Sequence, residues 1–263
     1  MSMDANNVAE HWENNAETWT TYSRAGYDKY RDALNTPAFL DMLPSVAGLT
    51  GLDLGCGEGT NTRSVARLGA RMTGLDIAPT FIRHARETEV LDPLGIDYLL
   101  GDGQHINFPA QSFDFVTAFM SLMDMANQRL VLQAVQHVLK PGGFLQFSIL
   151  HPCFVPPTRR NIRDENGKAI AVQIADYFDE TDGHIEHWLF SDIPANERAK
   201  LTPFSVPRFH RTLTSWVSMI VGAGLIIEAC GEPMASQEAA IAEPTVADTR
   251  VAPIFLHIRA RKT

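Results

Sequence analysis

The chain has 263 residues, of which 45% are hydrophobic and 20% are charged, and its formal net charge at pH 7 is −9. This length can bury one large core, or one core with a substantial insertion. The acidic balance argues against nucleic acid as a partner, because binding by counterion release needs a basic face. We therefore expect a small-molecule substrate.

The cysteines are three in number, Cys56, Cys153 and Cys230, and none belongs to a CxxC pair. This pattern argues against a disulfide framework or a zinc site and fits a reducing cytoplasm. No apolar run approaches the ~20 residues of a membrane helix. The N-terminal sequence is polar and acidic, unlike a secretory signal. We expect a cytoplasmic protein without a membrane partner, a monomer or a homodimer.

The first 45 residues are expected to be mainly helical. Asp4 or Asn6 is a candidate N-cap for a helix that carries Trp12 and Trp19, and we expect both tryptophans in the core. A second helical segment is expected at about residues 37–42, before a proline.

From residue 49 onward, short apolar strands alternate with helices. Strands are expected at 49–54, 71–76, 96–102, 113–120 and 144–150, and helices at 61–68, from Pro79, and at 128–139. Helical crossovers between strands predict a parallel sheet with right-handed connections. Residues 151–210 break this rhythm and are interpreted as an insertion over the sheet. A helix at 212–224, a strand at 225–229 and a strand at 254–260 predict a closing antiparallel hairpin.

The stretch "GLDLGCGEGT" at residues 51–60 resembles a nucleotide-binding loop but departs from the common fingerprints. The third glycine, Gly59, comes one residue too early for a dinucleotide site, and no Gly-Lys-Ser/Thr follows for a P-loop. Asp53 and Glu58 would repel a pyrophosphate, which otherwise favours a helix N-terminus. A cofactor with an ammonium and a sulfonium and no phosphate, such as S-adenosylmethionine, suits this loop.

Acidic residues follow at the next strand ends. Asp76 ends the second strand, where a carboxylate can accept both hydroxyls of a ribose. Asp102 ends the third strand and is a candidate acceptor for an adenine amino group, with Gly103 allowing close backbone approach. Phe119 and Met120 end the fourth strand near the first loop. Together these features predict a nucleoside-binding site.

The motifs "LDLGCGEG", "MTGLDIAP", "GDGQHINFPAQSFDFVTA" and "VLKPGGFLQFSI" resemble those of class I S-adenosylmethionine-dependent methyltransferases, close to the bacterial small-molecule enzymes of quinone biosynthesis. The resemblance implies a Rossmann-like, doubly wound, seven-stranded sheet, mostly parallel with an antiparallel C-terminal strand. The implied divisions are a helical lid (1–45), a cofactor-binding half (46–150), a substrate-side insertion (151–210) and a C-terminal half (211–263). The implied cofactor-binding residues are Asp53, Gly55, Cys56, Gly57, Gly59, Asp76, Ile77, Asp102, Gly103, Phe119 and Met120.

Three residues are candidates for catalysis. His151 directly follows the fifth strand, His210 precedes the next helix, and Asp124 follows the fourth strand. Each has a structural alternative: His151 in fixing a turn, His210 and Asp124 in capping helices. A general base is useful only for some acceptors, because methyl transfer needs mainly alignment.

Other residues leave alternatives open. Tyr22, Tyr30 and Arg31 are candidates to meet the methionine carboxylate, against simple packing. The His-x-x-His of "GHIEHW" lacks an evident third ligand, so no metal is expected. The favoured function is methyl transfer to O, N or C of a small molecule. Rival functions are an inactive cofactor-binding regulator and an enzyme that transfers another group from a derivative of the cofactor. The second rival needs an extra cation, for which Arg31, Arg159 and Arg208 are available.

Overall fold

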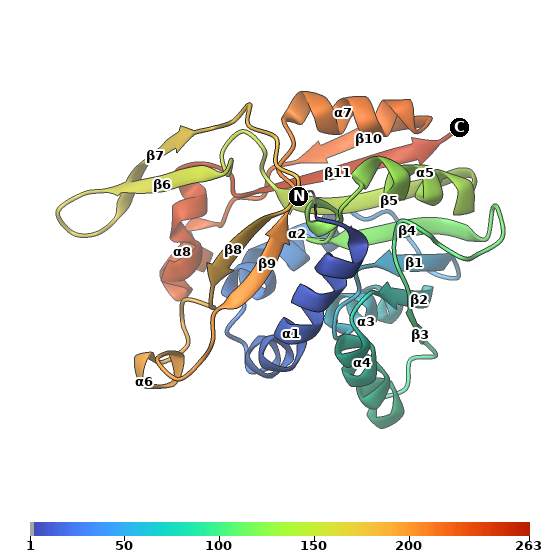
Figure 1. Cartoon of the computed structure of the whole chain (residues 1–263), viewed down its shortest axis with the longest axis horizontal. Helices are drawn as coiled ribbons and strands as arrows, with labels where there is room; N and C mark the ends of the chain where they lie inside the picture. The colour runs from blue at the N-terminus through green and yellow to red at the C-terminus, as the bar shows by residue number, and fades with distance from the viewer. Residues whose placement is uncertain (1–2) are drawn as a thin grey trace.

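Seven strands form one sheet in the order β10-β11-β5-β4-β1-β2-β3 in the computed structural model, which describes residues 3–263 (Figure 1). The strands are β1 (Thr50–Leu54), β2 (Arg71–Asp76), β3 (Asp97–Leu100), β4 (Phe113–Phe119), β5 (Leu139–Leu150), β10 (Leu225–Gly231) and β11 (Phe255–Lys262). Neighbouring strands from β3 to β5 pair in parallel, whereas β11 is antiparallel to both β5 and β10. The predicted fold class is confirmed, and the closing hairpin places β10 at the edge.

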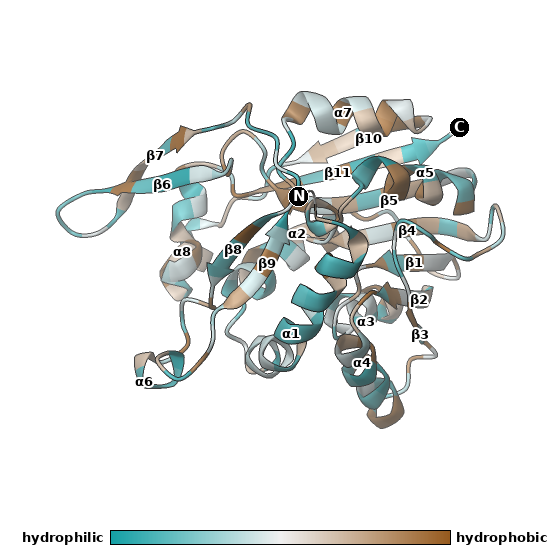
Figure 2. Cartoon of the chain, viewed as in Figure 1, coloured by the Kyte–Doolittle hydropathy of each residue, from teal (hydrophilic) through white to brown (hydrophobic). Residues whose placement is uncertain are grey.

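Helices cover both faces of this sheet and bury two apolar cores. One core joins α5 (Gln128–Val138) and α7 (Leu213–Gly222) to the strands, and the other joins α2 (Thr36–Met42), α3 (Thr60–Arg67) and α4 (Pro79–Leu91). The central strands are apolar along most of their length because both of their faces are covered (Figure 2). This arrangement brings the carboxyl ends of β1, β2 and β4 to a common edge, where parallel α/β sheets bind ligands.

The N-terminal segment forms helices that lie across this edge. Helix α1 (Ala5–Arg24) begins at Asp4, whose carboxylate accepts a hydrogen bond from the Asn7 amide at 2.9 Å. Asp4 rather than Asn6 is therefore the N-cap. A five-residue π-helix, η1 (Arg31–Asn35), precedes α2, and the sequence pattern did not predict it. π-Helical turns are rare and occur frequently at functional sites.

The insertion between β5 and α7 folds as two antiparallel hairpins. Strands β6 (Thr158–Arg163) and β7 (Ala169–Ala175) form a hairpin that projects from the body at the left of Figure 1. Strands β8 (His184–Trp188) and β9 (Phe204–Arg208) form a second hairpin, with α6 (Ala195–Arg198) between them. Strand β9 packs against α1. We expected no βαβ pattern in residues 151–210, and the two hairpins that form there agree with this expectation.

Three short helices complete the chain, namely η2 (Leu122–Asp124) after β4, and α8 (Gln237–Ala242) and η3 (Pro244–Arg250) before β11. Strand β5 differs from our expectation of a strand at 144–150, since it begins at Leu139 and includes the "KPGG" segment. Leu139 pairs with Phe113, and a register shift follows in β4, so the extra residues are accommodated without leaving the sheet. Within residues 3–263, no helix is both long and apolar enough to span a bilayer.

Candidate active site

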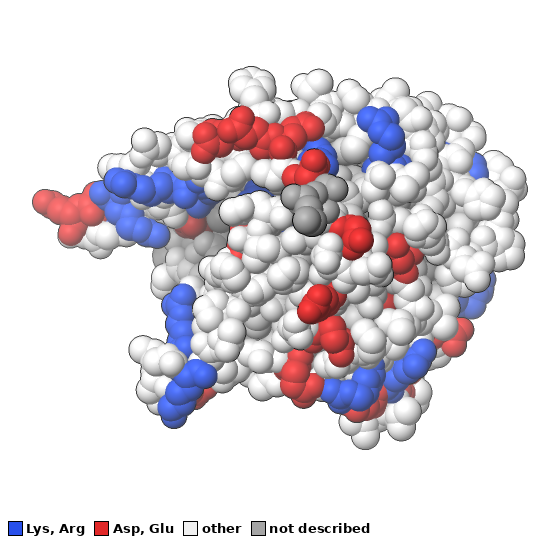
Figure 3. Space-filling model, in the orientation of Figure 1, with Lys and Arg blue, Asp and Glu red and all other residues white. Residues whose placement is uncertain are grey.

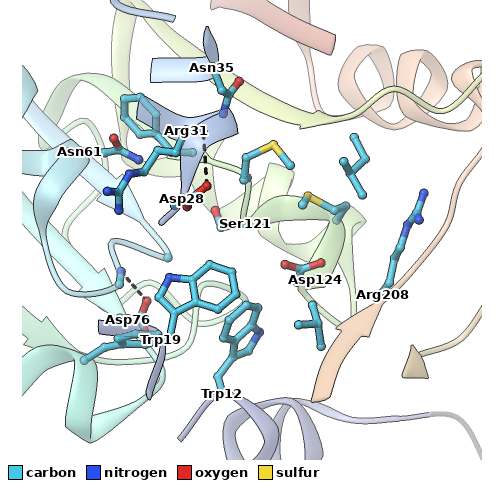
Figure 4. Close-up of a pocket in the computed structure, with 18 of the residues that line it drawn as sticks. Trp12, Trp19, Asp28, Arg31, Asn35, Asn61, Asp76, Ser121, Asp124 and Arg208 are labelled. Atoms are coloured by element: carbon cyan, nitrogen blue, oxygen red, sulfur yellow. Dashed lines mark hydrogen bonds between the residues drawn. The ribbon is translucent and has the colours of Figure 1, made fainter. Parts of the chain in front are cut away.

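A cavity of about 550 Å³ lies beyond the carboxyl ends of β1, β2 and β4. Its volume is within the range of small-molecule and cofactor sites. Residues of α1, η1 and the β8–β9 hairpin close it from the opposite side, so that side chains of the N-terminal segment and the insertion face the glycine loop (Figure 4). The cavity is therefore assembled from segments that are far apart in the sequence.

The glycine loop contributes backbone rather than side chains to the cavity. Gly55 and Gly57 have φ values of +67° and +55°, in the left-handed region that favours glycine. A Cβ on Gly55 would lie 2.4 Å from the Ser121 Cβ, whereas a Cβ on Gly57 would meet nothing within 4 Å. Gly57, unlike Gly55, leaves open space beside its backbone in a cavity wall, as a loop that receives a ligand requires.

Asp53 and Gly59 do not line the cavity. The Asp53 carboxylate accepts hydrogen bonds from the hydroxyls of Thr62 at 2.6 Å and Thr117 at 2.8 Å, and burial raises its pKa to about 7. Gly59 begins α3 in a left-handed conformation. Both residues therefore shape the loop from beneath it.

Asp76 faces the cavity at the end of β2. Its two carboxylate oxygens accept hydrogen bonds from the amides of Gly57 at 2.8 Å and Ala78 at 2.9 Å (Figure 4). Burial raises its pKa to about 6. Each oxygen keeps a second lone pair, so the carboxylate can still accept the two hydroxyls of a ribose.

The remaining predicted cofactor residues surround Asp76. Those that line the cavity are Gly55, Cys56, Gly57, Ile77, Asp102, Gly103, Phe119 and Met120. Asp102 accepts a hydrogen bond from the Gln104 amide at 2.9 Å. Met120 has a φ of +52°, an uncommon conformation for a residue with a side chain, and such strain is found at ligand sites. Cys56 is a buried thiol whose pKa burial raises well above its usual value, so the thiol stays neutral.

Glu58 is neutralised by the N-terminal segment. Its carboxylate lies 3.1 Å from Arg24 Nε and 3.6 Å from Arg31 Nη1. The charge of Glu58 therefore does not by itself exclude an anionic ligand, and this part of our sequence argument against a pyrophosphate is weakened. The departure of the loop from both phosphate-binding fingerprints is unaffected.

Polar groups absent from our sequence predictions gather near Arg31. Asp28 accepts a hydrogen bond from the Arg31 amide at 3.2 Å, and burial raises the pKa of Asp28 to about 6. Asn61 Oδ1 accepts from the Thr36 hydroxyl at 2.8 Å, and Asn61 also lines the cavity (Figure 4). This end of the cavity thus offers a cation, an acid and an amide to a zwitterionic group. Arg31 was among our candidates for the methionine carboxylate, whereas the loop that carries Asp28 contains no motif by which to find it.

Asp124 lies on the opposite side of the cavity and points into it (Figure 4). It is 5% exposed, and its carboxylate makes no hydrogen bond within residues 3–263. Burial raises its pKa well above the usual value, Glu186 adds to the rise, and Arg208 opposes it. Arg208 is paired with Glu186 at 2.7 Å. A buried carboxyl group without a partner is costly, which makes Asp124 the polar group best placed to meet a second ligand.

The two histidine candidates do not line the cavity. His151 is buried, and its Nε2 lies 2.8 Å from Glu232 while its Nδ1 accepts from the Cys153 amide. His210 is buried, its Nε2 lies 2.8 Å from the Tyr177 carbonyl oxygen, and burial lowers its pKa. Both rings have structural partners, in keeping with the alternatives stated for them.

Aromatic side chains form another part of the wall. Trp12, Trp19 and Trp188 line the cavity and are only partly buried. The rings of Trp12 and Trp19 meet edge to face at 5.4 Å, as do those of Trp19 and Trp188 at 5.3 Å. Trp12 and Trp19 also pack against buried apolar residues, so the expectation that they belong to the core holds in part: one side of this cluster faces the cavity. Tyr30 and Arg31 also line the cavity, whereas Tyr22 does not.

These features define a class of protein. A parallel α/β sheet ends in a glycine loop beside an acid for a ribose, and the same cavity holds groups for an amino acid and continues to a second polar site. The residues present fit S-adenosylmethionine, because Gly57 leaves open space, Asp76 can accept the ribose, and Arg31 and Asp28 have opposite charges. Within residues 3–263, no cluster of three or more His, Cys, Asp or Glu side chains is placed to hold a metal ion.

Comparison with known proteins leads to the same class. Residues 52–147 match the model of a methyltransferase domain. A ubiquinone biosynthesis O-methyltransferase of Xanthomonas oryzae is 35% identical over 130 residues, which cover 48% of this chain and 54% of that enzyme. The match thus spans about half the length of this curated relative.

Solved structures extend the similarity over most of the chain. An S-adenosylmethionine-dependent methyltransferase from Mesorhizobium loti superposes with a TM-score of 0.70 and 28% identity, over 86% of this chain and 96% of that one. A putative enzyme of the same type from Listeria monocytogenes gives a TM-score of 0.70 and 25% identity, over 87% and 96%. The chain thus contains a methyltransferase domain and resembles S-adenosylmethionine-dependent methyltransferases over most of its length, which points to S-adenosyl-L-methionine as its cofactor.

Proposed function

We propose that this protein transfers a methyl group from S-adenosylmethionine to a small-molecule acceptor. The observation that carries the proposal is that one cavity joins the cofactor-binding edge of the sheet to Asp124. Cofactor and acceptor can therefore meet without water between them. Residues 1–45 act as a lid and residues 151–210 as the acceptor-side cap in this proposal.

The cofactor is held by groups at both of its ends. Asp76 accepts hydrogen bonds from the ribose, and Ile77, Asp102 and Gly103 bound the adenine. Arg31 and Asn61 donate to the methionine carboxylate, and Asp28 accepts from the ammonium group. When bound, the cofactor supplies an electrophilic methyl group on a sulfonium.

Asp124 orients the acceptor and takes its proton. Burial raises the pKa of Asp124, which makes its carboxylate a stronger base than an exposed one. The tryptophans exclude water and pack against the apolar part of the acceptor. His151 and His210 act indirectly, by holding the segments that border the cavity.

An oxygen acceptor is supported by the name of the curated relative, an O-methyltransferase of ubiquinone biosynthesis. A neutral hydroxyl also suits a buried carboxyl group that can receive its proton. The net charge of −9 disfavours nucleic acid as the substrate. Three unpaired cysteines favour action in the cytoplasm, as a monomer or a homodimer.

Calorimetric titration tests the proposal first. We expect S-adenosylmethionine and S-adenosylhomocysteine to bind, and NAD not to bind. A screen of small hydroxylated aromatic compounds with methyl-labelled cofactor then tests transfer, with product mass as the readout. Failure of the cofactor to bind would overturn the proposal, and binding without any methylated product would overturn the transfer step.

A further inference from the structure

Arg159 is a cation in the cavity wall that lacks a counter-charge. It lies on β6, and its Nε donates a hydrogen bond to the Phe154 carbonyl oxygen at 3.1 Å. Neither terminal nitrogen has a hydrogen-bond or ion-pair partner within residues 3–263, and Nη2 is buried. A buried donor without a partner costs about 1–3 kcal/mol, and more if it is charged.

The other cations of the cavity wall are paired. Arg208 lies 2.7 Å from Glu186, and Lys29 lies 3.2 Å from Glu243. Arg31 pairs with Asp32 at 2.7 Å and approaches Glu58 at 3.6 Å. Among the cavity-lining cations of the described chain, Arg159 is thus the one that forms no ion pair.

The acid near Arg159 is already engaged. Asp248 accepts the Tyr30 hydroxyl at 2.8 Å on one oxygen and Asn161 Nδ2 at 3.1 Å on the other. Arg159 is close enough to Tyr30 to act on its pKa, yet no ion pair joins Arg159 to Asp248. Burial raises the pKa of Tyr30, so the tyrosine remains a neutral donor. The terminal nitrogens of Arg159 therefore keep N–H donors that a ligand can occupy.

The surrounding surface favours the approach of an anion. The exposed residues Arg160, Arg163 and Lys168 lie on the same projecting hairpin, in a chain whose net charge is negative. Figure 3 shows Lys and Arg side chains along this hairpin and acidic side chains at its tip, where Asp164 and Glu165 lie, so the basic residues outnumber the acidic ones and lie nearer the body. A local positive field of this kind raises the rate at which anionic ligands arrive.

We propose that Arg159 binds an anionic group, a carboxylate or a phosphate, carried by the methyl acceptor. The planar guanidinium can donate two parallel hydrogen bonds to either group. This inference rests on the proposed function, because it takes the cavity as the acceptor site. The acceptor is then a molecule with an anionic group for Arg159 and a methylatable group for Asp124.

Tryptophan fluorescence provides the test, since Trp12, Trp19 and Trp188 line the cavity. The protein, saturated with S-adenosylhomocysteine, is titrated with benzoate, with phenyl phosphate and with the neutral analogue benzamide. We expect at least one of the two anions to bind at least tenfold more tightly than benzamide, and the tighter anion identifies the group. An affinity for both anions no higher than for benzamide, including no binding at all, would overturn the proposal.

Arg159→Met and Arg160→Met form a matched pair on β6, the second being the control. We expect Arg159→Met to lose the preference for the anion and to keep the weak affinity for benzamide, while Arg160→Met, which removes only an exposed charge of the hairpin, changes the preference by less than threefold. Arg159→Lys should recover part of the preference. An unchanged preference in Arg159→Met would contradict the proposal.

Two further measurements separate the possible failures. Arg159→Met should melt at the same or a higher temperature than wild type, because it removes a buried guanidinium nitrogen that has no hydrogen-bond partner in the described chain; a large drop would show a structural role and contradict the inference. Repeating the benzoate and phenyl phosphate titrations without S-adenosylhomocysteine tests Arg159 alone. If the cofactor product fails to bind while the preference for an anion persists, the proposed function fails and the anion site stands.

Discussion

At the cofactor end of the cavity, polar groups have protein partners: Asp76 is held by two backbone amides, and Glu58 by two arginines. At the acceptor end, Asp124 and Arg159 face the cavity without partners for their terminal atoms. The first end is preorganised by the protein itself, so it binds a fixed molecule with little rearrangement. The second end keeps hydrogen-bonding capacity that no protein group of the described chain satisfies and that a ligand can use. Specificity for the acceptor is therefore expected to reside in the cap.

Asp124→Asn should produce the largest change. Loss of the base is expected to lower kcat by roughly 10²–10⁴-fold for a hydroxyl acceptor. Cofactor affinity should stay within twofold of wild type, because Asp124 lies on the acceptor side. The measurement is initial rate against acceptor concentration, with the exposed Asp179→Asn as control. Equal kcat in wild type and Asp124→Asn would remove the catalytic role.

Asp76→Ala should produce the second-largest change, and it should affect only the binding of the cofactor. Losing two hydrogen bonds to a charged group is expected to weaken S-adenosylmethionine by about 100-fold. Calorimetry measures the loss, and the exposed Asp97→Ala on the neighbouring strand is the control. A change below threefold in Asp76→Ala would show that the ribose lies elsewhere.

Two glycine substitutions distinguish a glycine that protein packing requires from a glycine that leaves room for a ligand. Gly55→Ala places a Cβ against Ser121 and should lower the melting temperature, through about 1–3 kcal/mol of overpacking added to the left-handed strain. Gly57→Ala meets no protein atom, so only the strain of about 1–2 kcal/mol affects folding, while the added methyl group obstructs the cofactor. Thermal melts with and without S-adenosylhomocysteine measure both effects. A normal ligand-induced shift in Gly57→Ala would place the ligand away from this loop.

The smallest predicted effect is a pH dependence of cofactor binding. The pKa of Asp76 is raised to about 6, so below this pH the carboxyl group is protonated and loses acceptor capacity. For the free protein the sign is the opposite: a raised pKa contributes stability that is present below pH 4 and is lost as the pH rises through 6. We expect the stabilisation by S-adenosylhomocysteine to grow between pH 5 and 7.5, corresponding to about tenfold in affinity. The same series with Asp76→Asn should be flatter; an equal slope would assign the titration to Asp28.

The sheet and its glycine loop could be predicted because their signals are local. The strands of residues 49–150 are short apolar runs bounded by turns, and the acids follow them directly in sequence. The predicted start of β5, at residue 144, was wrong because the strand continues through the two glycines that precede this residue. The pattern of the last helix and two strands predicted the antiparallel hairpin with β11, the resemblance to a known family supplied the number of strands, and their order was not predicted.

The acceptor end could not be predicted in the same way, because its residues meet only through tertiary contacts. Arg159 and Tyr30 come from distant segments, and the lack of an ion pair between Arg159 and the nearby Asp248 is visible only when both side chains are placed. Trp12 and Trp19 were assigned to the core because an apolar helix face looks the same whether it meets a core or a cavity. His151 and His210 follow strands, as site residues often do, yet their rings turn to Glu232 and Tyr177.

Glu58 joins a wall of the cavity to its roof, since Arg24 and Arg31 belong to the helical segment that covers the glycine loop. Exchange of spent cofactor requires that roof to move, and the movement breaks both ion pairs. Dissolved salt weakens such contacts once they are exposed to solvent. We therefore expect a higher ionic strength to shorten the residence time of the demethylated product on the protein. The rate of methyl transfer in the enclosed site should stay unchanged.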